Sequence, residues 1–155
     1  FDVPFVVPFA WAMIAHPILC AARRVAGNWV FLYGGYAMAA WDLFLDPQMV
    51  AANRWRWTFD GAHVPYQPEI PLSNTFGWLL AGMALIAILH QILPRDRRKS
   101  SASFGAVDIW LAWTFFGGVV SNLFFFDRPG IAFFGGIAFA LFFLPYAFSR
   151  WLGRP

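Results

Sequence analysis

The stretch "WVFLYGGYAMAAWDLFLDP", Trp29 to Pro47, is an apolar run that ends in two acids. It carries no charge from Trp29 to Ala40, and then Asp42 and Asp46 follow, four positions apart. A run of this length approaches the roughly 20 residues that a helix needs to cross a bilayer. Residues four apart lie on one face of a helix. The stretch therefore predicts a membrane helix with two carboxylates on one face near its end.

The composition of the 155-residue chain supports a membrane protein. Charged residues make up 12% of the sequence, which is half of the roughly 25% found in soluble domains. The net charge of +3 then sets orientation in the membrane rather than marking a nucleic-acid partner. The one cysteine, Cys20, allows no internal disulfide. We expect an integral protein of a prokaryotic plasma membrane that contacts lipids, associates with other membrane proteins and binds no nucleic acid.

Five apolar segments predict an all-α transmembrane bundle of about five spans, forming a single domain over residues 1–155. The spans run from about Val3 to Ala22, Asn28 to Asp46, Asn74 to Leu93, Gly105 to Phe126 and Ile131 to Trp151. Glycine pairs within three of these spans favour close packing of helices in lipid. The chain starts inside an apolar run without methionine, so we expect N-terminal spans of the full-length protein to precede it.

Basic residues divide unequally between the two predicted sides of the bundle. Three of them, Arg54, Arg56 and Arg128, fall on one side. Eight follow spans one, three and five on the other side: Arg23, Arg24, Arg95, Arg97, Arg98, Lys99, Arg150 and Arg154. The positive-inside rule makes the second side cytoplasmic and places the segment from Pro47 to Ser73 outside.

Pro47 directly follows Asp46, and this pair predicts a break in the second span. Proline has no N–H to donate and disfavours a helical residue before it. An Asp-Pro pair also suits a cap followed by the first residue of a new helix. We therefore expect a short interfacial helix from about Pro47 to Trp55. Asp46 is then either its cap or part of a functional site.

Asp42 lies about one turn deeper and has no such structural role. Ionisable residues inside spans are costly and are functional candidates by default. The alternative is a buried ion pair with Arg54, Arg56 or Arg128.

Polar side chains from three predicted spans converge at one depth near the outer side. The second span brings the two aspartates, the third begins at Asn74, and the fourth ends with Asn122 and Asp127. Lone asparagines also join helices to one another, which is the alternative for these residues. The candidate substrate-binding residues are Trp41, Asn53, Asn74, Trp78, Asn122, Phe124 and Asp127.

Motifs that the sequence lacks narrow the choice of chemistry. It shows no Gly-rich dinucleotide fingerprint, no paired histidine boxes and no Gly-x-Ser-x-Gly elbow. The Asp-x-x-x-Asp spacing suits Mg²⁺ and a diphosphate, as in membrane prenyltransferases, but no second acidic pair occurs in any span. A non-catalytic lipid-binding subunit of a larger membrane assembly is the other alternative.

Three motifs resemble one family. "WDLFLDPQMV" from Trp41, "IPLSNTFGW" from Ile70 and "SNLFFFDRPGIAFFGG" from Ser121 are similar to membrane carotenoid hydratases of the bisanhydrobacterioruberin hydratase type. The resemblance covers nearly the whole chain, and family members are longer, with further spans before the region that matches Phe1. It implies a carotenoid or other long isoprenoid lipid as partner. It also implies addition of water to the terminal double bond of an acyclic carotenoid, giving a tertiary alcohol.

This chemistry suits the paired carboxylates. Hydration needs an acid that protonates the alkene and a base that accepts a proton from water. Two carboxylates in a low-dielectric site cannot both ionise without a large cost, so one stays protonated. We expect Asp42 and Asp46 to be catalytic, with the deeper Asp42 suited to the acid role. Aromatic faces such as Trp41, Trp78 and Phe124 can stabilise a cation. The reaction requires no metal or redox cofactor.

Overall fold

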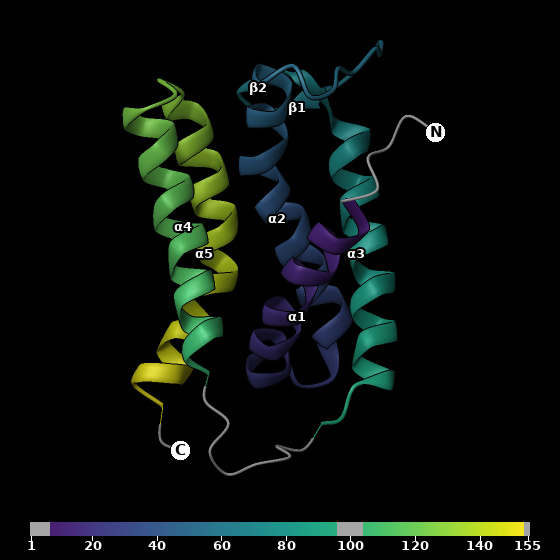
Figure 1. Ribbon diagram of the computed structural model, residues 1–155, viewed down its shortest axis with the longest axis vertical. Helices are drawn as coiled ribbons and strands as arrows, with labels where there is room; N and C mark the ends of the chain where they lie inside the picture. The colour runs from purple at the N-terminus through teal and green to yellow at the C-terminus, as the bar shows by residue number, and fades with distance from the viewer. Residues whose placement is uncertain (1–6, 96–103, 154–155) are drawn as a thin grey trace.

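Helices dominate the architecture, with one small β-hairpin at one end (Figure 1). The structure is a computed structural model that describes residues 7–95 and 104–153. Its five α-helices match the five predicted segments, so the mostly helical fold class is confirmed. They are α1 (Val7–Val25), α2 (Val30–Ala51), α3 (Leu72–Ile92), α4 (Gly105–Phe124) and α5 (Pro129–Trp151), with a 3₁₀ turn, η1 (Gly27–Trp29), between the first two.

Three of these helices have the properties of membrane spans. Within residues 7–95 and 104–153, α3, α4 and α5 are long and apolar enough to cross a membrane. They also expose large hydrophobic side chains, such as Ile109 at 72% and Trp113 at 77% on α4. Such surfaces suit contact with lipid tails and are costly in water. The protein is therefore an integral membrane protein.

Helix α2 lies at the centre of the bundle (Figure 1). It packs most extensively against α3 and also contacts α1 and α5. Glycines allow the close approach of α2 and α3, because a Cβ on Gly34 would lie 2.8 Å from Cγ2 of Ile86. A Cβ on Gly82 would likewise lie 3.1 Å from Cβ of Met38. These positions support the predicted role of small residues in helix packing.

Phe44 fixes α2 against the pair formed by α4 and α5. A Cβ on Gly118 of α4 would lie 2.8 Å from Cδ2 of the Phe44 ring, and one on Gly135 of α5 would lie 2.9 Å from its Cε1. The ring therefore occupies a slot that exists only because both positions are glycine. Since Phe44 is in the same turn as Asp42 and Asp46, this slot sets the rotation of the turn that carries both aspartates.

The predicted break at Pro47 is wrong. Helix α2 runs through Pro47 to Ala51, so Asp46 is an interior residue, and no separate helix covers Pro47 to Trp55. Proline leaves the carbonyl four residues earlier, that of Leu43, without its helical N–H donor. The side-chain amide of Gln67 donates to this oxygen instead, with Nε2 to O at 2.9 Å. A tertiary hydrogen bond thus replaces the missing helical one.

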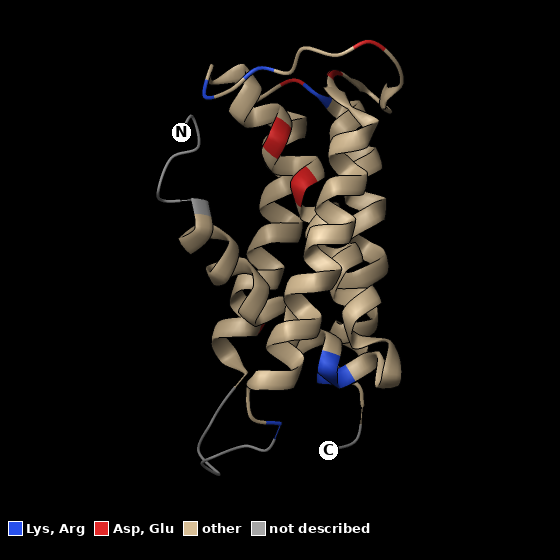
Figure 2. Cartoon of the chain, turned by 90° about the vertical axis from the view of Figure 1, so that its right-hand side faces the viewer, with Lys and Arg blue, Asp and Glu red and all other residues tan. Residues whose placement is uncertain are grey.

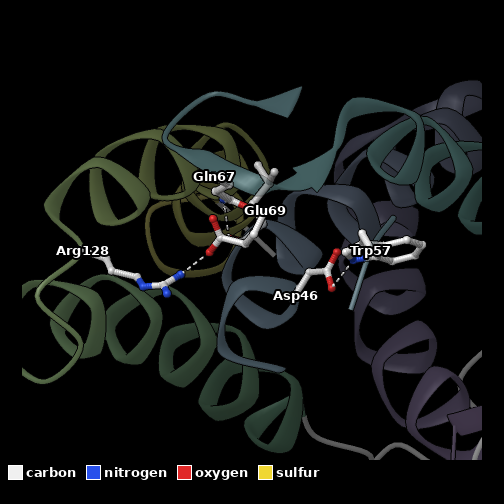
Figure 3. A network of polar contacts seen from close by, with 6 residues as sticks. Asp46, Trp57, Gln67, Glu69 and Arg128 are labelled. Carbon is white, nitrogen blue, oxygen red and sulfur yellow. Dashed lines mark hydrogen bonds and ion pairs between the residues drawn. The ribbon is translucent and has the colours of Figure 1, made fainter. Parts of the chain in front are cut away.

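The hairpin that supplies Gln67 covers the end of α2 and was not predicted. Strands β1 (His63–Val64) and β2 (Gln67–Pro71) pair antiparallel, with Val64 opposite Gln67. Val64 and Ile70 pack on Leu43 to form a small second core beneath the hairpin. An ion pair of 2.6 Å between Arg128 and Glu69 joins β2 to the residues just before α5 (Figure 3).

Arginines gather at the opposite end of the bundle and bond to the last turns of other helices. Arg23 donates to the carbonyl oxygens of His90 and Leu93, both at 2.9 Å, and Arg24 donates to that of Ser149 at 2.7 Å. Arg150 pairs with Asp108 at 3.2 Å. The charged residues lie mainly at the two ends of the bundle (Figure 2), as the predicted topology requires. Four of its basic residues, Arg97, Arg98, Lys99 and Arg154, lie outside the described residues.

Candidate active site

Asp42 and Asp46 lie one turn apart on α2 and share a hydrogen-bond donor from α3. Their exposed fractions are only 2% and 1%. Nδ2 of Asn74 donates to Oδ2 of Asp42 at 3.0 Å and to Oδ2 of Asp46 at 2.6 Å. A single amide group therefore bridges both carboxylates. The structure brings together these three residues that the sequence placed at one depth.

Two tryptophans complete the surroundings of Asp46. The chain after α2 folds back, so that Nε1 of Trp55 donates to Oδ1 of Asp46 at 2.5 Å and Nε1 of Trp57 donates to the same oxygen at 3.3 Å (Figure 3 shows Trp57). With Asn74, Asp46 therefore accepts three N–H groups. Neither tryptophan was predicted from the sequence to belong to the site. Only their indole N–H groups, nine and eleven residues after the carboxylate, could have indicated it.

Asp42 has far fewer partners than Asp46. Its Oδ1 is buried and has no hydrogen-bond partner among the described residues. The predicted alternative for Asp42 was an ion pair with a nearby arginine. Arg128 instead pairs with Glu69, and none of the arginines in the described part of the chain forms a salt bridge with Asp42. The pair therefore consists of one carboxyl group with a free buried oxygen and one that is fully hydrogen-bonded.

Indole rings from three helices cluster beside the turn of α3 that follows Asn74. Trp78 follows Asn74 by one turn of α3, so both lie on the same face. Trp41 precedes Asp42 and meets Trp78 edge-on, with ring centroids 5.8 Å apart. Trp11 of α1, which the sequence did not single out, stacks on Trp78 at 4.2 Å. Three helices thus contribute to one aromatic group adjoining the carboxylate pair.

The other candidate residues make no hydrogen bond to the aspartates within the described part of the chain. Asn122 is buried, but its Nδ2 donates to the carbonyl of Gly118 within α4 at 2.8 Å. Phe124 is 76% exposed on α4, and Asp127 is exposed in the turn before α5. Asn53 is exposed after α2, where its Oδ1 accepts a bond from Arg56 at 3.0 Å.

Two cavities flank α2, and each is lined in part by residues that neighbour the aspartates in the sequence. One, of about 380 Å³, is lined almost entirely by apolar side chains of α2, α3, α5 and the hairpin, including Leu43 and Phe134. The other, of about 330 Å³, lies between α2 and α4 and includes Trp41, Gln48 and Ser121. Their lining suits a long apolar molecule with little polar surface.

The groups that contact the aspartates are N–H donors from neighbouring side chains. The described residues contain no group of three or more His, Cys, Asp or Glu side chains that could hold a metal ion. The groups that approach Asp46 are N–H donors from Asn74, Trp55 and Trp57. Two of these donors bond to Oδ1 of Asp46 and the third bonds to its Oδ2.

The family model of carotenoid biosynthesis proteins matches residues 1–143, which include the whole site. The chain belongs to the carotenoid biosynthesis protein family. The predicted resemblance is confirmed at that level, and membership implies carotenoid substrates. No curated protein and no solved structure matches the chain.

Proposed function

We propose that the protein adds water to the terminal double bond of an acyclic carotenoid, giving a tertiary alcohol, within a bundle of five membrane spans. The observation that carries the proposal is the difference between the two aspartates. Oδ1 of Asp42 is buried without a partner, whereas Asp46 accepts three N–H groups. This arrangement supplies one protonated acid beside one stabilised anion.

Asp42 is suited to be the acid. A carboxylate gains stability from each N–H that donates to it, and Asp46 has three such donors against one for Asp42. When the pair shares one proton, the proton therefore resides on Asp42. Its unpartnered Oδ1 can then donate this proton to the less substituted carbon of the alkene, which leaves a tertiary cation on the other alkene carbon.

Water completes the reaction by attacking that cation. The new C–O bond forms at the tertiary carbon, and the proton that the water loses returns to the Asp42–Asp46 pair. One water is consumed, and the pair ends in its starting protonation state. Asn74, which bonds to both carboxylates, holds them at a fixed separation through this exchange.

The indole rings support the cation between these steps. A cation over the face of an aromatic ring gains about 2 kcal/mol or more where water is excluded. Trp41 precedes Asp42 on α2 and Trp78 lies one turn from Asn74 on α3, and the stacked Trp11 restrains Trp78. The same surroundings exclude bulk water, which limits premature loss of the cation.

The proposal is tested by expressing the full-length protein in a host that accumulates an acyclic carotenoid. We expect a product heavier by one water in cells with the parent protein and none with the empty vector. Isolated membranes should retain this activity in the presence of a strong chelator. A product that disappears with chelator would favour the Mg²⁺-dependent alternative. Unchanged pigment bound to the purified protein, without any hydrated product, would favour the binding subunit.

A further inference from the structure

Gln67 occupies an unusual position beneath the hairpin. It is completely buried, yet its amide makes one hydrogen bond, from Nε2 to the carbonyl oxygen of Leu43, while its own Oε1 has no partner. Burying a polar group is costly unless it is hydrogen-bonded. An apolar side chain would fill this space at a lower free-energy cost. The single hydrogen bond of Gln67 is therefore the property that distinguishes it from an apolar residue at this position.

That bond reaches the one backbone oxygen in α2 that Pro47 leaves free. Leu43 lies between Asp42 and Asp46 in the sequence, so its carbonyl belongs to the turn that carries both carboxylates. Without a donor, this carbonyl would tilt away from the helix axis toward water or another partner, and α2 would kink, as helices do at proline. The Gln67 amide keeps the turn helical and holds the two aspartates in register with Asn74.

The hairpin is itself anchored, so Gln67 approaches α2 from a fixed element. Glu69 of the same strand pairs with Arg128 at 2.6 Å (Figure 3). The Tyr66 ring covers Gly130 at the start of α5, where an added Cβ would lie 2.6 Å from the ring. Val64 and Ile70 pack on the Leu43 side chain whose carbonyl Gln67 bonds. A rigid support of this kind is what a precise catalytic geometry requires.

We infer that Gln67 is a positioning residue for the proposed reaction, which acts by replacing the hydrogen bond that Pro47 removes from the turn bearing Asp42 and Asp46. The inference rests on the proposed function. It makes the requirement for Gln67 conditional, since a residue with an N–H at position 47 would restore the helical bond to Leu43. No role in packing or in substrate contact would depend on Pro47 in this way.

A double-mutant cycle tests this dependence. Gln67→Met keeps the length of the side chain and removes the donor, and Pro47→Ala restores the helical N–H. We expect Gln67→Met to lower the maximal rate of hydration in isolated membranes about tenfold or more, with little change in the carotenoid concentration at half-maximal rate. In the Pro47→Ala background, the same substitution should change the rate less than about twofold. Gln91→Met, the same substitution at an exposed glutamine in the last turn of α3, is the matched control and should stay near the parent.

Thermal unfolding of the purified variants, together with the rates, distinguishes a failure of the role of Gln67 from a failure of the proposed function. Gln67→Met should lower the unfolding midpoint in the parent background and have a smaller effect in Pro47→Ala. Equal losses of rate in both backgrounds, with the parent active, would overturn the role of Gln67 and leave the proposed function standing. A parent that forms no hydrated product would overturn the proposed function, and the role of Gln67 with it.

Discussion

Gly118→Ala should destabilise the bundle, whereas the neighbouring Gly117→Ala should not. A Cβ at Gly118 would lie 2.8 to 2.9 Å from three carbons of the Phe44 ring, and Gly135 blocks the ring from moving away on the other side. A Cβ at Gly117 would meet only the Trp113 indole, at 3.8 Å. Both changes gain about 1 kcal/mol of helix propensity, but only the first incurs an overpacking cost of about 1–3 kcal/mol.

The difference between the two variants therefore isolates the overpacking cost. For a chain of this length, 1 kcal/mol shifts the unfolding midpoint by about 2–4 °C, so Gly118→Ala should unfold about 2–12 °C below Gly117→Ala in detergent. Phe44→Leu combined with Gly118→Ala should recover part of the loss, since the smaller side chain makes room for the methyl. Equal midpoints for the two alanine variants would refute the assigned slot.

Three further sets of substitutions should change the rate of carotenoid hydration or the unfolding midpoint. Asn74→Leu removes the amide that bridges both carboxylates. It should lower the rate of carotenoid hydration by about tenfold to a hundredfold, because a hydrogen bond to a charged group contributes about 1.5–3 kcal/mol. Retained activity in a product assay would contradict the bridge. Trp55→Phe removes the donor at 2.5 Å and should reduce product formation more than Trp57→Phe, whose donor is at 3.3 Å; the reverse order would contradict the assigned contacts. Arg23→Met leaves the carbonyl oxygens of His90 and Leu93 without the donor that Arg23 supplies. It should therefore lower the unfolding midpoint by about 2–4 °C per kcal/mol lost. An unchanged midpoint would contradict a stabilising role for these hydrogen bonds.

The sequence predicted the helices because their signal is local. Apolar runs of the right length identify each segment, and small residues within them identify packing faces. Asp42, Asp46 and Asn74 could be grouped because depth in the membrane follows from counting residues along each span. Counting residues gives the depth of a side chain in the membrane but not the face of the helix on which it lies. It therefore also included Asn122, which bonds within its own helix.

The features that sequence reasoning missed depend on contacts between distant segments. Pro47 ordinarily ends a helix, and α2 continues only because Gln67, 24 residues from Leu43, supplies a donor to the freed carbonyl. The indole N–H groups of Trp55 and Trp57 reach Asp46 only because the chain reverses after α2. The side chains were visible in the sequence, but their partners were set by the tertiary fold.

The central claim is that Asp42 delivers the proton to the carotenoid, and a comparison of two carboxylate substitutions tests it most directly. Membranes with the parent protein are incubated with an acyclic carotenoid in deuterium oxide. They should form an alcohol with deuterium on the carbon adjacent to the one that bears the new hydroxyl group. Asp42→Asn should form none while still retaining carotenoid on purification, because an amide cannot protonate an alkene. Asp60→Asn, at an exposed aspartate outside the bundle, should match the parent. Labelled product from Asp42→Asn at the parent level would contradict the account.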